Sequence, residues 1–339
     1  MKLIRTEDAV GQVLCHDLTR IIPGKEKGAA FRKGHIVTEE DIPVLLSMGK
    51  QHLYIWEKTE GILHEDEAAK ILYELCKNDN IVPGDDIKEG KIELFAGCDG
   101  LFCVNSAALR RLNLQGEMMI ATRPGGFAVK KGDKLAAMRI IPLVIEEEKM
   151  EAARAAVGSE PLLSLTPFGK HKVGIVTTGS EVYTGRIKDA FGPVIRDKMA
   201  EYGTEVIGQV ILDDKPEMIT QAIKDFIDKG ADMVVCTGGM SVDPDDTTPS
   251  AIKATGATIV SYGAPVLPGA MFLLSYLDDF PIMGLPGCVM YAKRTVFDLV
   301  LPRVLAGQKL TVEDLAEYGE GGLCLSCDVC TFPNCGFGK

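Results

Sequence analysis

The chain has 339 residues, of which 46% are hydrophobic and 25% charged, a balance typical of soluble globular proteins. This length exceeds what one ordinary hydrophobic core fills, so it predicts at least two domains. The net charge of −11 argues against nucleic acid and anionic membrane as main partners, because both would be repelled. No apolar run reaches the roughly 18 residues of a membrane-spanning helix, and the N-terminal residues lack the apolar centre of a signal peptide. We therefore expect a cytoplasmic protein.

The N-terminal half predicts a β-rich α+β domain over residues 1–157. Apolar residues at helical spacing indicate its helices, and apolar runs bounded by glycine turns indicate its strands. In chain order we expect a short capped helix after residues 38–41, a strand at 52–56, a helix at 64–77, a mainly β stretch at 92–145 and a helix at 146–157. Residues 158–170 contain two prolines and two glycines and are interpreted as a linker.

The second half alternates strands and helices and predicts an α/β domain over residues 171–307. The expected strands are 172–176, 205–212, 233–236, 258–262, 271–276 and 281–285, and the expected helices are 193–203, 215–229, one starting at 249, and 292–305. Strands separated by helices favour a mostly parallel sheet with helices on both faces, which is a doubly wound fold. A tail at 308–339 follows.

Four loops of this domain follow apolar strands, at 177–181, 213–214, 237–248 and 284–288. In a doubly wound sheet such loops meet at the carboxyl edge of the strands and line one crevice. The loop at 237–248 is the most informative, because a buried strand, a glycine turn and a helix start at Pro249 form the usual anion site of such sheets. Glycines there let backbone N–H groups approach an oxyanion. Two Pro-Gly turns, at 268–269 and 286–287, resemble either oxyanion loops or plain turns.

Acidic residues gather in the same loops: Glu181, Asp213, Asp214, Asp243, Asp245 and Asp246. Carboxylates that meet in one crevice suit Mg²⁺, a hard ion that takes carboxylate and substrate oxygens. The alternative is helix capping, by Asp213 or Asp214 at helix 215–229 and by Thr247 or Thr248 at the helix from Pro249. Glu181 and Asp246 have no such capping role, and we interpret them as catalytic residues.

These motifs, in this order over residues 171–307, resemble the molybdopterin-binding domain shared by molybdopterin adenylyltransferases, molybdopterin molybdenumtransferases (the insertases) and gephyrin. The resemblance implies that the glycine loops bind the pterin and its phosphate, and that the acidic residues act in metal or nucleotide chemistry. The cofactor-binding residues implied for molybdopterin or its adenylated form are Thr178, Gly179, Ser180, Gly238, Gly239, Ser241, Thr248, Pro268, Gly269, Pro286 and Gly287. It also implies a homo-oligomer.

The resemblance has departures that separate the functions it allows. Asp245 stands where the adenylyltransferases have arginine, so a cation facing phosphate has become an anion. Residues 9–14 and 31–35 are similar to the insertases' opening segment, whereas their MDGYA signature is absent. We expect an insertase-like protein that works on molybdopterin and molybdate. The alternatives are a non-catalytic carrier that delivers the cofactor to a client molybdoenzyme, and a domain repurposed for another nucleotide.

Ten cysteines are present, and four lie in the last 16 residues of the chain: Cys324, Cys327, Cys330 and Cys335. Three thiols at three-residue spacing resemble the ferredoxin run that holds a [4Fe–4S] cluster. Structural Zn²⁺ is the second interpretation, although two separated CxxC pairs are its commoner pattern. The third is that the tail holds no stable metal. The other six cysteines lie in mostly apolar surroundings and are interpreted as buried small hydrophobic residues.

Overall fold

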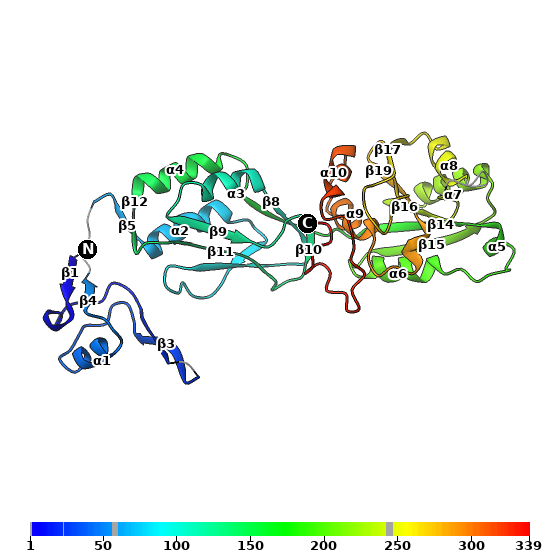
Figure 1. The fold of residues 1–339 in the computed structure, drawn as a ribbon. Coiled ribbons are helices and arrows are strands. Elements are labelled where there is room, and N and C mark those ends of the chain that lie inside the picture. Colours follow the sequence, from blue (N-terminus) through cyan, green and yellow to red (C-terminus); the bar gives the residue numbers. More distant parts are fainter. Residues whose placement is uncertain (1, 23, 56–59, 242–246) are drawn as a thin grey trace. The chain divides into compact units, whose positions relative to one another are not determined.

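The computed structural model describes residues 2–22, 24–55, 60–241 and 247–339 (Figure 1). The chain forms two compact units. The first contains residues 1–97, 104–123 and 132–164, and the second contains residues 98–103, 124–131 and 165–339. Among the described residues, every helix is too short or too polar to span a lipid bilayer.

The second unit is built on a six-stranded sheet in the order β15-β14-β16-β19-β18-β17. The strands are β14 (Lys172–Thr178), β15 (Glu205–Leu212), β16 (Met233–Thr237), β17 (Thr258–Tyr262), β18 (Leu273–Leu277) and β19 (Phe280–Leu285). The first four in spatial order are parallel, and β17 and β18 complete the sheet as antiparallel strands. A mostly parallel sheet confirms the fold class that the alternating strands and helices predict.

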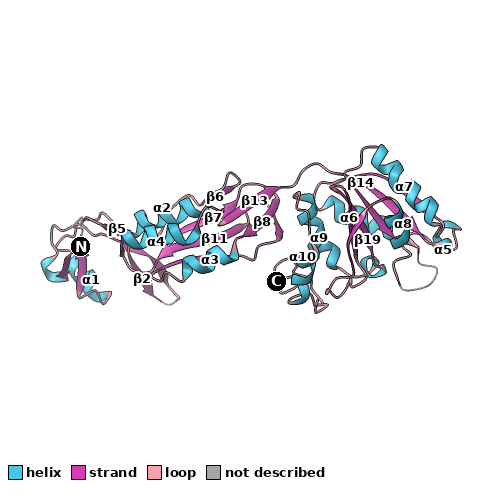
Figure 2. Cartoon of the chain, turned by 90° about the horizontal axis from the view of Figure 1, so that it is seen from above, coloured by secondary structure: helices cyan, strands magenta, loops and turns pink. Residues whose placement is uncertain are grey.

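Helices cover both faces of this sheet (Figure 2). They are α5 (Ser180–Tyr183), α6 (Phe191–Ala200), α7 (Pro216–Asp228), α8 (Thr248–Ala254), α9 (Val296–Leu305) and α10 (Val312–Ala316). Side chains of α6 and α9 pack into one core with Val235 of β16, and side chains of α7 and α8 pack into a second core with Val234. Successive strand residues point to opposite faces, so one apolar strand serves both cores.

The first unit is β-rich, as its sequence predicts. Its elements are β1 (Lys2–Arg5), β2 (Leu18–Ile22), β3 (Glu26–Phe31), α1 (Asp41–Ser47), β4 (His52–Ile55), β5 (Ile62–His64), α2 (Glu65–Cys76), β6 (Ile81–Pro83), β7 (Ile92–Ala96), α3 (Ser106–Asn113), β9 (Met118–Thr122), β11 (Lys134–Ile140), β12 (Val144–Glu146) and α4 (Glu147–Val157). Its largest sheet is antiparallel, in the order β6-β7-β11-β9.

A separate three-stranded sheet has the order β10-β8-β13. Its strands are β8 (Gly100–Val104), β10 (Phe127–Val129) and β13 (Leu163–Pro167). The last of these strands lies inside the segment 158–170, which the sequence predicts to be a linker.

Helix α3 and the start of α9 also differ from the sequence expectation. Helix α3 occupies residues that were predicted to be β, because the Asn105 side chain accepts a hydrogen bond from the Ala108 N–H and so caps a helix. The closing helix α9 begins at Val296 and not at 292. Its start is fixed by a capping box in which Thr295 and Asp298 satisfy each other's backbone N–H groups.

Candidate functional site

The four parallel strands end at one edge of the sheet. Thr178 pairs with Leu212, Thr177 with Thr237, and Thr237 with Leu285, so the carboxyl ends of β14, β15, β16 and β19 lie in adjacent positions. The loops after these strands therefore start from one edge, which is where ligands bind in open α/β sheets.

The turn after β16 requires glycine at two consecutive positions. Gly238 has φ +82°, and a Cβ added there would lie 2.1 Å from the carbonyl oxygen of Thr178. Gly239 has φ +54°, and its added Cβ would lie 2.8 Å from the Thr248 hydroxyl. Within the described part of the chain, the N–H groups of Gly238 and Gly239 donate no hydrogen bond. Two adjacent amides of this kind form a concave site that suits an anion.

Thr248 connects this turn to the neighbouring loop. Its buried hydroxyl donates a 2.9 Å hydrogen bond to the Gly238 carbonyl and lies 3.3 Å from the hydroxyl of Thr178. The predicted capping role is therefore wrong for Thr248. Thr247 occupies the N-cap position of α8 without a side-chain capping bond, and its hydroxyl donates to the Asp214 carbonyl at 3.2 Å. The hydroxyls of Thr247 and Thr248 bond the loop after β15 and the loop after β16, and these bonds fix the spacing of the two loops.

The acidic pair after β15 does not cap α7. Asp214 accepts a 2.8 Å hydrogen bond from the Ser180 N–H at the start of α5, and Asp213 forms a 3.2 Å ion pair with Lys215. The predicted cap is wrong because α7 begins with Pro216, which has no N–H to satisfy, and its N-cap Lys215 makes no side-chain capping bond. Asp214 instead ties the loop after β14 to the loop after β15.

Of the two predicted catalytic residues, the structure describes only Glu181. Glu181 is exposed in the first turn of α5, and its carboxylate lies beside Gly179, 3.5 Å from where a Cβ of that residue would be. Asp246 lies outside the described residues, as do Asp243 and Asp245. The loop entrance at Ser241 is held by β17, because the Tyr262 hydroxyl donates to its carbonyl oxygen at 3.2 Å.

Among the described residues, the two Pro-Gly turns, at 268–269 and 286–287, form no hydrogen bond with the Gly238 turn and adjoin other elements. Gly269 packs against the start of α9, since its added Cβ would lie 2.6 Å from Val296 Cγ1, and the Val296 N–H donates to the Pro268 carbonyl at 3.2 Å. Gly287, which follows Pro286, begins the short 3₁₀ helix η2 (Gly287–Met290).

Sequence reasoning missed a partly buried hydrogen-bond chain that starts at the ends of β14 and β16. The Thr237 hydroxyl donates to the Thr177 hydroxyl at 3.2 Å, and the Gln209 side-chain amide donates to Thr177 and to Asp189 at 3.0 and 2.7 Å. Asp189 in turn accepts the N–H of Phe191 at the start of α6. The available signal was two hydroxyl residues at the ends of strands that are otherwise apolar, because a buried hydroxyl needs a partner.

The C-terminal tail is anchored on the second unit and does not form the predicted Cys₄ site. Its backbone pairs with Leu267, which accepts from the Cys324 N–H at 2.8 Å. Cys324 and Cys335 pack against the core, whereas Cys327 and Cys330 are exposed. All four cysteines line a cavity of about 870 Å³. Among the described residues, no three His, Cys, Asp or Glu side chains are placed to hold a metal ion, at the tail or at Asp213 and Asp214.

Comparison with known families identifies the second unit. Residues 174–306 match the family model described as "Probable molybdopterin binding domain". This segment belongs to the molybdopterin-binding domain family. The match confirms the resemblance drawn from the motifs, and it contains both Gly238 and Thr248. Residues 3–57 match a second model, described as a domain of unknown function.

Curated relatives match only a short stretch of the chain. Proteins named CinA-like protein from Mycobacterium avium (strain 104) and Mycobacterium tuberculosis (strain ATCC 25618 / H37Rv) are 42% and 39% identical over 77 residues. That stretch is 23% of this chain and 18% of each relative, so the chain spans less than a fifth of the relatives' length.

Solved structures are similar at low identity. The molybdopterin biosynthesis enzyme MoaB from Thermus thermophilus is 22% identical, with 41% of this chain and 98% of that chain covered and a TM-score of 0.34. A molybdenum cofactor biosynthesis protein from Pyrococcus furiosus is 13% identical, with 91% of this chain and 66% of that chain covered and a TM-score of 0.28.

Proposed function

We propose that this chain binds molybdopterin or its adenylated form during maturation of the molybdenum cofactor, and that it acts as an insertase-like molybdenumtransferase. The observation that carries the proposal is the glycine turn at 238–239, which presents two adjacent N–H groups at the carboxyl edge of the sheet. The family match over residues 174–306 supports molybdopterin as the ligand. The phosphate of molybdopterin is the anion that such a turn would bind.

The residues around the turn receive distinct roles in this proposal. Gly179, Gly238 and Gly239 would contact the ligand through their backbones, because they carry no side chain, and Ser180 would contact it through its exposed side chain, since its N–H is bonded to Asp214. Thr178 and Thr248 hold two of the loops at a fixed distance through their hydroxyls. By the family resemblance, Ser241 and the two Pro-Gly turns would add contacts to the pterin, although no hydrogen bond among the described residues joins these turns to the Gly238 loop.

Glu181 and Asp246 are proposed as the groups that act in transfer of molybdenum. A carboxylate and a bound oxyanion repel each other unless a proton or a cation lies between them. We therefore expect the reaction to require Mg²⁺ together with molybdate. The alternative function is a non-catalytic carrier that hands the cofactor to a client enzyme. The aspartate at position 245, where the adenylyltransferases have arginine, speaks against adenylation in either case.

The test is a titration of the full chain with molybdopterin and with its adenylated form, followed by addition of molybdate and Mg²⁺. Consumption of the adenylated form, with molybdenum incorporated, supports the insertase. Tight binding of either form without consumption supports the carrier. If neither form binds, the proposed function is wrong.

Substitutions separate binding from chemistry. Asp246→Asn is expected to abolish turnover while leaving the binding free energy within about 1.4 kcal/mol, a tenfold change in Kd. Glu181→Gln is expected to behave in the same way. Asp228→Asn is the matched control, because Asp228 is an exposed carboxylate at the opposite end of α7 and should leave both quantities unchanged. Loss of folding in Asp246→Asn would show that Asp246 is structural.

A further inference from the structure

The first unit contains a polar cavity of about 350 Å³ that the proposed function does not use. Segments distant in sequence form its wall, including the start of β2, the end of the loop after α1, the start of α2 and the end of β11. Its lining residues are His16, Asp17, Leu18, Thr19, Lys50, Tyr54, Glu65, Glu89, Arg139, Ile141 and Leu143. A cavity of this size holds a small organic molecule.

Glu65 is the unusual residue of this cavity. Its side chain is only 7% exposed, and Gly90 covers it so closely that a Cβ at position 90 would lie 2.7 Å from Glu65 Oε2. Among the described residues, Arg139 forms an ion pair with Glu65 at 3.6 Å, which is beyond hydrogen-bond distance. The Nε–H of Arg139 donates instead to the Ile140 carbonyl. Glu65 is therefore a buried carboxylate whose oxygens receive no hydrogen bond from a described residue.

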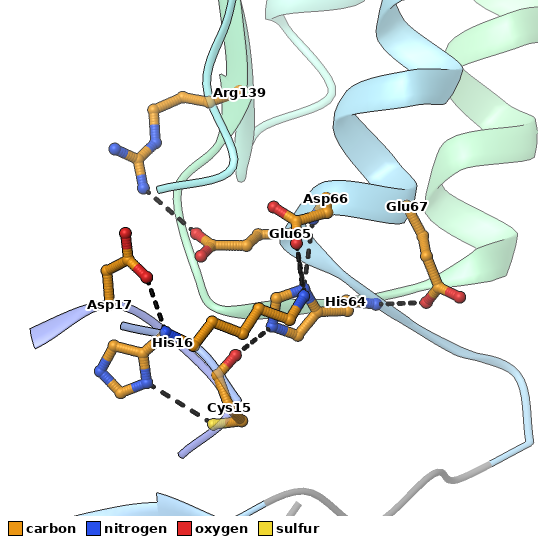
Figure 3. Close-up of polar contacts among 9 residues, drawn as sticks. Cys15, His16, Asp17, His64, Glu65, Asp66, Glu67 and Arg139 are labelled. Carbon is orange, nitrogen blue, oxygen red and sulfur yellow. Dashed lines mark hydrogen bonds and ion pairs between the residues drawn. The ribbon is translucent and has the colours of Figure 1, made fainter. Parts of the chain in front are cut away.

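A buried carboxylate that has one long ion pair and accepts no hydrogen bond from a described residue is incompletely satisfied, so the site favours a ligand that donates N–H groups to it. Burial, with the neighbouring Asp66 carboxylate, raises the pKa of Glu65. Figure 3 shows Glu65 extended toward Arg139, and Asp17 and His16 line the same cavity. The Glu65 carboxylate is therefore a hydrogen-bond acceptor in the wall of the cavity.

The charge balance of the lining is negative. Asp17, Glu65 and Glu89 face two cations, Lys50 and Arg139. Burial lowers the pKa of His16, so this imidazole is neutral near pH 7 and adds no positive charge. Asp17 and Glu89 each accept one hydrogen bond, from the Lys33 N–H and the Thr19 hydroxyl, which leaves further lone pairs for a ligand.

The rest of the lining is apolar or aromatic, from Leu18, Leu143, Ile141 and Tyr54. A ligand that matches both the acidic and the apolar part of the lining carries paired N–H donors at one end and an apolar group at the other. A bare metal ion does not fit, because the described residues contain no group of three metal ligands.

We propose that this cavity binds a small organic cation of the amidine or guanidine class, with Glu65 accepting both of its N–H donors and the apolar lining covering its hydrocarbon part. Planar paired donors match a carboxylate in the way that arginine does. All residues that line the cavity belong to the first unit, so this proposal does not depend on molybdopterin binding by the second unit.

Benzamidine is the probe, and isothermal titration of the full chain is the measurement. Benzamide has nearly the same shape without the charge, and benzoate carries the opposite charge. Benzamidine is expected to bind one site per chain. Benzamide should bind at least about tenfold more weakly, because a charge-assisted hydrogen bond exceeds a neutral one by about 1.4 kcal/mol or more. Benzoate should show no binding. Equal affinity for benzamidine and benzamide, or no binding of benzamidine, overturns the proposal.

The variant Glu65→Gln locates the site. It keeps the shape of the side chain and is expected to weaken benzamidine binding at least about tenfold. The control is Glu93→Gln, a carboxylate of the same unit that pairs with Lys91 and Lys134 outside the cavity and should leave the affinity unchanged. Unchanged affinity in Glu65→Gln contradicts the proposal. If Glu65→Gln does not fold, the benzamide comparison on the unaltered chain decides alone.

Discussion

Replacing Gly238 by alanine tests how the glycine turn is built. The added methyl group would lie 2.1 Å from the Thr178 carbonyl oxygen, whereas an ordinary carbon–oxygen contact is about 3.3 Å, so the turn must move by roughly 1 Å. The positive φ of +82° adds strain of about 1 kcal/mol for a residue with a side chain. Overpacking contributes about 1–3 kcal/mol more. We expect a total loss of about 2–4 kcal/mol in unfolding free energy.

Gly230→Ala is the matched control for this substitution. Gly230 has φ +79°, nearly the same backbone conformation, but its added Cβ would meet nothing within 4 Å. It should therefore lose only the backbone strain, about 1 kcal/mol. Urea denaturation of both variants measures the difference. For molybdopterin, we expect the displaced amides of Gly238→Ala to weaken binding at least about tenfold, and Gly230→Ala to leave the affinity unchanged.

Two results would refute this reasoning. Equal stability losses in the two variants would mean that the contact between Gly238 and Thr178 is not as close as the structure places it. A large stability loss with unchanged molybdopterin affinity would mean that the turn is structural and that the ligand binds elsewhere.

Three further predictions concern side chains. Thr248→Val removes the hydroxyl that bonds the turn and should cost about 1–2 kcal/mol in urea denaturation, which Thr248→Ser restores; no loss in the valine variant would contradict the assigned bond. Lys198→Met removes one of the two cations that pair with buried Asp298, at 2.6 Å, while Arg294 remains at 2.9 Å, so the variant should cost about 1.5–3 kcal/mol in unfolding free energy. A neutral result would contradict a stabilising role of the Lys198 bond. Because the folded-state pKa of Glu65 is raised, the native chain binds that proton more tightly than the unfolded chain, so its contribution to stability falls as pH rises above about 4.3. The unfolding free energy of Glu65→Gln relative to the unaltered chain should then increase from pH 4 toward pH 7; a difference that does not change with pH would contradict the raised pKa.

The α/β domain was predictable because its sequence repeats one physical pattern. β15 runs from Glu205 to Leu212 as expected, and α7 lies within one residue of its predicted bounds, because apolar periodicity is strong in both. The glycine turn was also readable, since Gly238 and Gly239 follow directly after a buried strand. These features depend on residues that are near one another in the chain.

The features that sequence did not reveal depend on partners far apart in the chain. Thr177 and Gln209 are 32 residues apart, and no local pattern shows that they share a hydrogen bond. Asp214 was expected to cap the next helix, yet it bonds Ser180, which is 34 residues away. Glu65 is one of three consecutive acidic residues in the first turn of α2, and only the packing of Gly90 and Arg139 around it distinguishes it from the other two.

The most direct measurement is an equilibrium titration of the full chain with molybdopterin, with the Gly238→Ala variant measured alongside. We predict saturable binding of one molybdopterin per chain and a clear loss of affinity in the variant. Absence of binding, or equal binding by both proteins, would contradict the claim that the glycine turn at the carboxyl edge of the sheet is a molybdopterin site.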